Sequence, residues 1–355
     1  MSNLTSGDQP DMRRPSEWLT AVGAGLPALS RRAGRTRENG PMRSPNQRVV
    51  IGRVLLIVAL LVAGCGARPT TPTTAPAAPG DFIGPVEIGN GRHLFLECRG
   101  QGTPTVILES GYHNSSDPWS QSDAAAPATG PAVLTALARE HRVCAYDRPG
   151  TLRNTSPLAI TDRSSPVPMP RTANDVVSDL HTLLDAAHVP GPYILVGHSL
   201  GGLFVRLYAQ THPEQVRAVV FVDAFGVEIP SLMGPDWPAY RQDLDQPPAE
   251  LTDTKSFETV DIDASLAQVA AAAPFPAVAT AVLTRTEPFR IPSDVAPDKS
   301  EKLERAWRDA AARLVELRPQ TPHIVATGSD HFIQVQQPDL VAAAVGLVIQ
   351  RSASR

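Results

Sequence analysis

Residues 195–209 read LVGHSLGGLFVRLYA. An apolar run leads into the turn GHSLG at 197–201, after which apolar side chains recur at helical spacing. The turn matches the pattern G-x-S-x-G, in which two glycines let a strand reverse sharply into a helix and leave the serine hydroxyl at the carboxyl end of the strand. The stretch therefore predicts a strand, a tight turn and a helix, with Ser199 as a candidate nucleophile.

Short apolar runs alternate with amphipathic stretches on both sides of this turn. This alternation is typical of a mostly parallel sheet covered by helices on both faces, so the sequence predicts an α/β fold. The expected strands are 93–98, 105–110, 141–147, 193–199, 216–225, 276–286 and 321–329, and the expected helices are 174–189, 200–212, 301–317 and 338–350.

The charge of the chain is unevenly distributed. Of its 355 residues, 42% are hydrophobic and 19% are charged, which provides enough apolar material for a sizeable core. The formal net charge is −4, but residues 1–64 hold nine arginines and only four acidic residues, so the remainder carries −9. An acidic body without a basic stripe is a poor match for phosphate backbones, and we expect no nucleic-acid partner.

The segment before Cys65 has the layout of a secretory signal. Arg48 and Arg53 precede an apolar run at 54–63, and small residues stand ahead of the cysteine. This run is too short for the roughly twenty residues of a membrane-spanning helix. The residues VAGC at 62–65 resemble a bacterial lipobox, which implies lipidation of Cys65. An ordinary signal peptide with an incidental cysteine is the alternative.

The front of the chain thus divides into two parts. Residues 1–64 are read as an upstream extension and a signal, with translation expected to begin at Met42. Residues 65–80 are rich in Pro, Thr and Ala and are expected to form an extended tether. We expect an exported protein, either a lipoprotein held at the outer face of the bacterial cell membrane through its lipid anchor only, or a secreted protein.

Taken together, four stretches resemble the α/β-hydrolase superfamily in its single-domain esterase and lipase-like branch: TVILESG at 105–111, CAYDRPG at 144–150, LVGHSLGG at 195–202 and GSDHFIQVQQP at 328–338. The resemblance covers residues 81–351. It implies a mostly parallel eight-stranded sheet with helices on both faces and the chain order nucleophile, acid, histidine.

A lid is expected after the sixth strand of that sheet. The segment at about 226–275 is rich in proline and shows no clear strand alternation. It is longer than an ordinary connection, and connections of this length in compact domains are often functional.

The resemblance assigns catalytic roles to residues of this chain. Ser199 would be the nucleophile, and His331, just past the last expected strand, the general base. The acid has two candidates: Asp223, at the end of the strand 216–225, which we favour, and Glu287, in the loop after the next strand. Glu287 is followed at once by a proline and lacks the usual Gly-x-x-Asp spacing.

The same resemblance places the oxyanion hole at two backbone amides. One belongs to Leu200, directly after the nucleophile, and the other to Tyr112. This chain has Ser110 where the family usually has a histidine, a change that leaves backbone donation possible. Asp147 and Arg148 are expected to hold the loop that begins with them.

Two cysteines follow Cys65 in the chain, at Cys98 and Cys144. The family's sheet order makes their strands neighbours, so a disulfide is conceivable, while two buried free thiols are the alternative. No two cysteines or histidines show zinc-ligand spacing and no Gly-rich phosphate loop is present, so we expect neither a metal nor a cofactor.

These expectations combine into an exported serine hydrolase that cleaves a small-molecule carboxylic ester through an acyl-enzyme intermediate. The same residues would also serve amide or thioester substrates. The alternative from another class is a catalytically silent lipoprotein that keeps the α/β-hydrolase fold only to bind a partner.

Overall fold

The computed structural model describes residues 80–121, 130–251, 255–290 and 296–353. The expected start at Met42, the signal segment, the lipidation site Cys65 and the tether up to residue 79 lie outside the described residues. The expectations for these segments therefore stay predictions.

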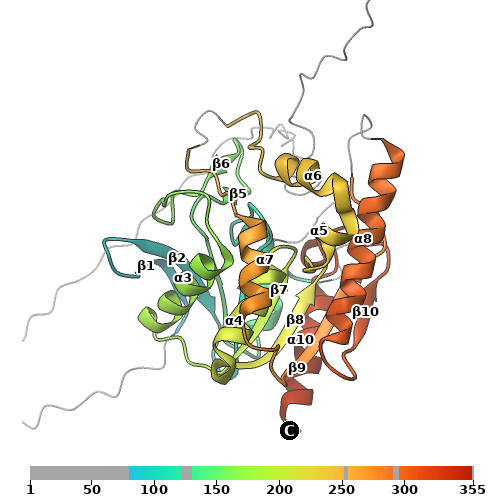
Figure 1. Ribbon diagram of the computed structural model, residues 1–355. Coiled ribbons are helices and arrows are strands. Elements are labelled where there is room, and N and C mark those ends of the chain that lie inside the picture. Colours follow the sequence, from blue (N-terminus) through green and yellow to red (C-terminus); the bar gives the residue numbers. More distant parts are fainter. Residues whose placement is uncertain (1–79, 122–129, 252–254, 291–295, 354–355) are drawn as a thin grey trace, which may run out of the picture. The chain divides into compact units, whose positions relative to one another are not determined.

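An eight-stranded sheet with the order β1-β2-β4-β3-β7-β8-β9-β10 forms the centre of the fold. β1 pairs antiparallel with β2 and β2 antiparallel with β4, whereas the other neighbours are parallel (Figure 1). The mostly parallel eight-stranded sheet expected from the sequence is confirmed. Its strands are β1 (Phe82–Glu87), β2 (His93–Arg99), β3 (Thr105–Glu109), β4 (Val143–Tyr146), β7 (Tyr193–His198), β8 (Val216–Val222), β9 (Ala279–Arg285) and β10 (His323–Ala326).

Helices cover both faces of the sheet (Figure 1). One face carries α3 (Ala173–Ala186), α4 (Gly201–Thr211), α7 (Ile262–Ala271) and α8 (Pro297–Glu316), and the other carries α2 (Val133–Leu137) and α10 (Pro338–Ala353). The remaining short elements are η1 (Asp117–Trp119), β5 (Leu152–Arg153), β6 (Ala159–Ile160), η2 (Pro213–Gln215), α5 (Ile229–Met233), η3 (Gly234–Asp236), α6 (Trp237–Leu244) and α9 (Ile333–Gln336).

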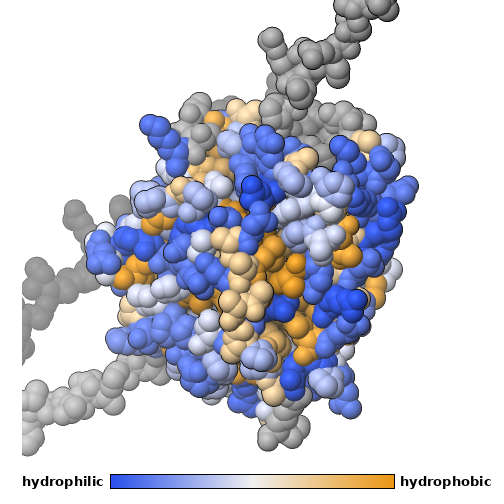
Figure 2. All heavy atoms as spheres, in the orientation of Figure 1, coloured by the Kyte–Doolittle hydropathy of each residue, from blue (hydrophilic) through white to orange (hydrophobic). Residues whose placement is uncertain are grey.

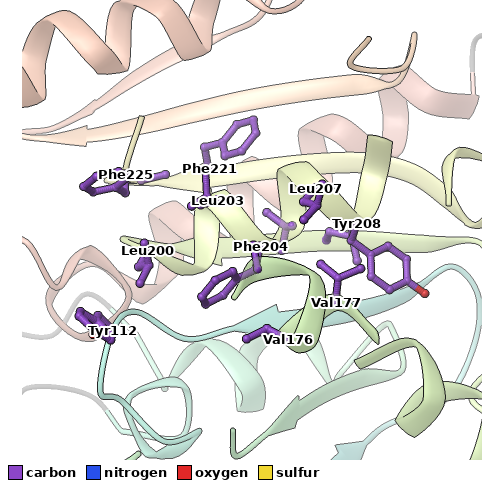
Figure 3. Close-up of a cluster of buried hydrophobic side chains, with 14 of the residues drawn as sticks. Tyr112, Val176, Val177, Leu200, Leu203, Phe204, Leu207, Tyr208, Phe221 and Phe225 are labelled. Carbon is purple, nitrogen blue, oxygen red and sulfur yellow. The ribbon is translucent and has the colours of Figure 1, made fainter. Parts of the chain in front are cut away.

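The strand side chains alternate between two buried clusters, one on each face. In β7, Leu195 joins the cluster under α3 and α4, whereas Ile194 and Val196 join the cluster under α10. Successive side chains of a strand point to opposite faces, so a strand buried on both sides needs a continuous apolar run. Figure 3 shows part of the first cluster, with Phe204 of α4 close to Val176 of α3.

Capping groups in the sequence set where two of the covering helices begin. The Asp175 carboxylate accepts from the Thr172 amide at 2.8 Å, and the Thr172 hydroxyl accepts from the Asp175 amide, which forms a capping box at the start of α3. The Asp261 carboxylate accepts from the Ala264 amide at 3.0 Å at the start of α7. Both helices pack against α4, the helix that follows Ser199.

The strand expected at 216–225 is shorter in the structure. β8 ends at Val222, because Asp223 has a φ of 39°, a left-handed conformation in which the extended pairing cannot continue. The last three residues of the expected strand therefore belong to a loop at the edge of the sheet.

The segment 226–275 contains helices that the sequence pattern did not predict. It includes α5, η3, α6 and α7. Since α7 packs against α3 and α4, it belongs to the layer of helices over the sheet. The lid role of this segment stays a prediction.

Cys98 and Cys144 form a disulfide between β2 and β4. The two residues are directly opposite in the antiparallel register, and both are buried. Of the two alternatives left open for these cysteines, the structure has the disulfide.

Figure 2 shows the face of the molecule that carries α7 and α8. Hydrophobic residues gather over α7, whereas hydrophilic residues cover the outer side of α8. This agrees with α8 being amphipathic, since it buries Leu303, Trp307 and Leu314 toward the core. Among the helices that the structure describes, none combines the length and the apolar character needed to span a bilayer.

Candidate active site

Ser199 lies in the turn between β7 and α4, at the carboxyl edge of the sheet. Its φ of 51° is left-handed, a conformation that is costly for a residue other than glycine. The Ser199 amide donates to the Val222 carbonyl at 3.1 Å, and the Ser199 carbonyl accepts from the amides of Gly202 at 2.9 Å and Phe225 at 2.8 Å. These bonds hold the strained turn that the G-x-S-x-G pattern predicts.

The loop after β3, residues 110–113, rests directly against this turn, and we call it the oxyanion loop. A Cβ atom at Gly201 would lie 2.5 Å from the carbonyl oxygen of Ser110. A Cβ atom at Gly111 would lie 3.0 Å from Cβ of Ser199. The first approach is closer than real Cβ contacts allow and the second is tighter than most of them, so glycine at each position lets the two segments meet.

His331 and Asp223 are paired at the same edge of the sheet. Nδ1 of His331 lies 2.6 Å from Oδ2 of Asp223, and the two side chains are 3% and 1% exposed. Asp223 directly follows β8, and His331 follows β10. Within the described residues, Nε2 of His331 is buried and has no hydrogen-bond partner. A histidine held by a carboxylate at one nitrogen and unpartnered at the other has the form of a general base.

Of the two candidate acids, the structure brings Asp223 to His331 and leaves Glu287 elsewhere. Arg285 donates from Nε to Oδ2 of Asp223 at 3.0 Å, which orients the carboxylate. Glu287 is exposed, and its carboxylate accepts from the Thr286 hydroxyl at 3.4 Å. The sequence left these two acids open because the choice depends on which strand end lies next to the histidine.

The backbone amides of Leu200 and Tyr112 are both next to the nucleophile. Leu200 follows Ser199 at the start of α4, and Tyr112 follows Gly111, which contacts Ser199. In Figure 3 the side chains of Leu200 and Tyr112 lie toward the same end of the cluster. Among the described residues, neither amide donates to a backbone carbonyl, so both are unused by the fold.

Ser110, which stands in place of the family's usual histidine, closes the start of the oxyanion loop. Its hydroxyl donates to the carbonyl of Ser115 at 2.8 Å and accepts from Nε1 of Trp119 at 3.0 Å. All three residues are buried. The change from histidine therefore leaves the loop held by the serine's own hydrogen bonds.

A second buried histidine, His198, supports the backbone of His331. Its Nε2–H donates to the His331 carbonyl at 2.9 Å. Burial, with repulsion from His331 in addition, holds the pKa of His198 well below its usual value, so the ring is neutral near pH 7. No sequence pattern indicates this contact, because the two residues are 133 positions apart.

Asp147 and Arg148 have different partners. The Asp147 carboxylate accepts from the Thr161 hydroxyl at 2.6 Å and from Nε of Arg163 at 2.7 Å, which holds the loop that follows β4 as expected. The Arg148 side chain instead leaves that loop and donates to the carbonyls of residues 110 and 111. Arg148 thus has a structural role, but the sequence does not predict its acceptors, because they come from a segment that only the fold brings close.

The surroundings of His331 are mainly aromatic. The ring centroids of Phe289, Trp307 and Phe332 lie 5.1, 5.5 and 5.6 Å from that of His331. Within the described ranges, no group of three or more His, Cys, Asp or Glu side chains is arranged to hold a metal ion. The site thus consists of a serine, a histidine–aspartate pair and two unused amides.

Curated relatives match this chain only in part. A protein of Hormonema carpetanum named as a probable transporter, efuK, is 33% identical over 146 residues, covering 39% of this chain and 18% of that protein. The pimeloyl-[acyl-carrier protein] methyl ester esterase of Chromobacterium violaceum is 32% identical over 131 residues, covering 37% of this chain and 40% of the esterase. The chain therefore spans less than half the length of these relatives.

Solved structures share the architecture at low sequence identity. The haloalkane dehalogenase DatA from Agrobacterium tumefaciens C58 superposes with a TM-score of 0.52 at 17% identity, covering 77% of this chain and 97% of the dehalogenase. The serine hydrolase CCSP0084 from Cycloclasticus zankles gives 0.50 at 16% identity, covering 76% and 98%. At these identities the likeness shows the fold alone.

A match to a known protein family agrees with the strand order of the sheet. A family described as alpha/beta hydrolase fold matches residues 104–279, a range that includes Ser199 and Asp223. The strand order, this match and the superposed structures all agree, and the chain therefore has the α/β-hydrolase fold.

Proposed function

We propose that the protein is a serine hydrolase that cleaves carboxylic esters through an acyl-enzyme intermediate. The observation that carries this proposal is the 2.6 Å pair of His331 and Asp223, with Nε2 of His331 unpartnered among the described residues, at the sheet edge that bears Ser199. The relative from Chromobacterium violaceum, named as a methyl ester esterase, supports an ester as the substrate.

In the acylation half of the reaction, Oγ of Ser199 attacks the ester carbonyl carbon while Nε2 of His331 takes up the hydroxyl proton. Asp223 keeps its hydrogen bond from Nδ1–H, which fixes the tautomer and stabilises the imidazolium. The amides of Leu200 and Tyr112 donate to the oxyanion that forms. The intermediate then expels the alcohol, which takes the proton from Nε2, and the acyl group stays on Ser199.

In the deacylation half, a water molecule gives a proton to Nε2 of His331 and attacks the acyl carbon. The second tetrahedral intermediate uses the same two amides. Its collapse releases the carboxylic acid and returns the proton to Oγ of Ser199. The cycle consumes one water and one ester and needs no other reactant.

Hydrolysis of a graded series of p-nitrophenyl esters, from acetate to palmitate, tests this function. We expect the full chain to cleave part of the series and Ser199→Ala to lose about three orders of magnitude or more in kcat. Ser178→Ala, at an exposed serine on α3, is the matched control and should keep full activity. A wild-type protein that cleaves none of the esters and ignores a serine-directed phosphonate contradicts the proposal and favours the silent binding protein.

We also propose that the protein is exported and anchored by a lipid on Cys65. The Cys98–Cys144 disulfide supports export, because disulfides persist in oxidising compartments. Cells that express the full chain are fed a clickable palmitate analogue, and the protein is then examined for the label. Label in the wild type and none in Cys65→Ser is the expected result. An unlabelled wild type, or label retained in Cys65→Ser, contradicts the anchor.

A further inference from the structure

The Arg148 side chain holds the peptide group that carries one of the two oxyanion donors. Nη2 of Arg148 donates to the carbonyl of Gly111 at 2.7 Å, and Nη1 donates to the carbonyl of Ser110 at 2.8 Å. The Gly111 carbonyl and the Tyr112 amide belong to one planar trans peptide, so their C=O and N–H bonds point in opposite directions. Fixing the carbonyl on Arg148 therefore fixes the direction of the Tyr112 N–H.

The other donor is oriented in the same way. The Ser199 carbonyl and the Leu200 amide also share one peptide group, and that carbonyl accepts from the amides of Gly202 and Phe225. Both candidate donor peptides are thus tied by their carbonyl oxygens. The difference is that the Ser199 carbonyl is bound by backbone amides alone, whereas the Gly111 carbonyl accepts from the Asn114 amide at 3.1 Å and, more closely, from the Arg148 side chain at 2.7 Å.

Two carboxylates hold the Arg148 guanidinium on its remaining sides. Nη1 lies 2.6 Å from Oε1 of Glu109, and Nε lies 2.6 Å from Oε1 of Glu258. The three side chains are 2%, 0% and 2% exposed for Arg148, Glu109 and Glu258, and the Tyr146 hydroxyl donates to the second oxygen of Glu109 at 2.6 Å. The planar Arg148 guanidinium, with acceptors on all its sides, is held in one orientation. A lysine ammonium cannot reproduce these hydrogen bonds.

Glu258 connects this cluster to the segment inserted after β8. Its Oε2 accepts from the His113 amide at 2.7 Å, and its own amide donates to the Gly150 carbonyl at 2.9 Å. Tyr112 is therefore held on both sides, through the carbonyl of the residue before it and the amide of the residue after it. Its hydroxyl accepts from the Val260 amide at 2.8 Å, close to Glu258 in the chain.

Opposite charges hold Arg148, Glu109 and Glu258 together. Burial alone would lower the pKa of Arg148, but the attraction of Glu258 and Glu109 outweighs it and holds that pKa above its usual value. The guanidinium is therefore charged over the whole range in which the protein is folded. A hydrogen bond from a cation to a peptide carbonyl also polarises the N–H of the same peptide and strengthens it as a donor.

We propose that Arg148 is a positioning residue for the oxyanion hole: bound between Glu109 and Glu258, it orients the Gly111–Tyr112 peptide so that the Tyr112 amide meets the developing oxyanion. Glu258 makes that orientation depend on the inserted segment. This inference rests on the proposed function, because an oxyanion hole has a use only where a carbonyl is attacked.

Kinetics of Arg148→Lys in the full chain test the proposal. We expect kcat to fall about 10- to 100-fold while KM changes less than about twofold, since a misdirected donor weakens binding of the transition state only. Asp179→Asn is the matched control, because Asp179 on α3 forms a largely buried ion pair with Arg171, and its other ion-pair partner among the described residues is Arg92. It should lose stability and keep kcat.

Two inhibitors separate positioning from a general loss of structure. Oγ of Ser199 adds to the carbonyl carbon of a trifluoromethyl ketone, and the adduct carries an oxyanion. The corresponding methyl ketone binds mainly without this addition. In Arg148→Lys the Ki of the trifluoromethyl ketone should rise by the same factor as kcat/KM falls, and the Ki of the methyl ketone should stay constant. An equal rise for both inhibitors, or kcat unchanged as in Asp179→Asn, overturns the proposal.

Hydrogen exchange gives a readout that needs no activity. Peptides covering residues 110–116 should exchange faster in Arg148→Lys than in the wild type, and should be unchanged in Asp179→Asn. Unchanged exchange of this segment in Arg148→Lys overturns the positioning role whether or not the protein cleaves esters. The opposite outcome is also informative. If the oxyanion loop exchanges faster in Arg148→Lys as expected but the wild type cleaves no ester, the proposed function is overturned and the positioning role is not.

Discussion

Nδ1 of His331 lies 2.6 Å from Oδ2 of Asp223, in a pair of side chains that are almost completely buried. The same carboxylate oxygen accepts from Nε of Arg285 at 3.0 Å, and the Arg285 amide lies 3.4 Å from the other oxygen. Asp223 is thus held in one orientation, with the histidine as one of its two side-chain partners. This geometry makes Asp223 the acid on which activity should depend.

Replacing this acid should remove most of the activity. In Asp223→Asn the amide cannot stabilise the imidazolium and favours the wrong tautomer of His331, so kcat should fall by about four orders of magnitude. Glu287→Gln changes an exposed carboxylate and should leave kcat within about twofold. Steady-state hydrolysis of a p-nitrophenyl ester by both variants decides between the acids, and the reverse order of effects would contradict this assignment.

The sequence predicted the parts of the site that a local pattern encodes. Ser199 follows from its strand–turn–helix context, and His331 is implied by the resemblance to the α/β-hydrolases, which place their histidine after the last strand. The alternation of apolar runs likewise predicted the sheet, because a strand buried on both faces must be apolar throughout.

Pairings between distant segments could not be predicted in the same way. Asp223 and Glu287 remained alternatives, and so did the disulfide and the free thiols of Cys98 and Cys144, because each choice depends on distances in the folded chain. The partners of Arg148 were missed for the same reason, since Glu258 is 110 positions away.

A methyl group at the nucleophile turn should destabilise the fold. The Cβ atom of Gly202→Ala would lie 2.4 Å from Cβ of Ala224, so the loop after β8 must shift at a cost of about 1–3 kcal/mol. Gly346→Ala in α10 is the control, since nothing lies within 4 Å of its new Cβ atom and alanine favours the helix by up to about 1 kcal/mol. Urea unfolding measures both changes, and equal midpoints for the two variants would speak against this packing.

The disulfide should contribute to stability. It closes a loop with a sequence separation of 46 residues, and the double variant Cys98→Ala/Cys144→Ala should lose about 2–4 kcal/mol of unfolding free energy. A reducing agent should lower the urea midpoint of the wild type and leave that of the double variant unchanged. A wild-type midpoint that does not respond to reduction would show that this bond does not stabilise the protein.

His113 should make the protein less stable in acid. Burial lowers its pKa from the usual 6.5 to about 4, while Nε2–H donates to the Leu244 carbonyl at 2.7 Å. Between these two pH values the unfolded chain binds more protons than the folded one, so the stabilisation is complete above pH 6.5 and is lost as the pH falls toward about 4. The loss should reach about 2–3 kcal/mol at a pH slightly above 4.

Unfolding free energies of the wild type and His113→Phe at several pH values measure this effect. The variant should show a flatter dependence on pH, even if its stability at pH 7 is lower. His188→Asn, at an exposed histidine whose φ of 50° suits asparagine, is the control. Parallel curves for His113→Phe and the wild type would contradict the assignment.

The central claim is that Ser199 carries the acyl group during turnover. Its most direct test is rapid acid quenching of the full chain with a p-nitrophenyl ester, followed by mass spectrometry of the peptide that contains Ser199. We predict an acyl adduct on Ser199 that forms in the first turnover and decays as the ester is consumed. Turnover without this adduct, or an adduct that persists in Ser199→Ala, would contradict the account.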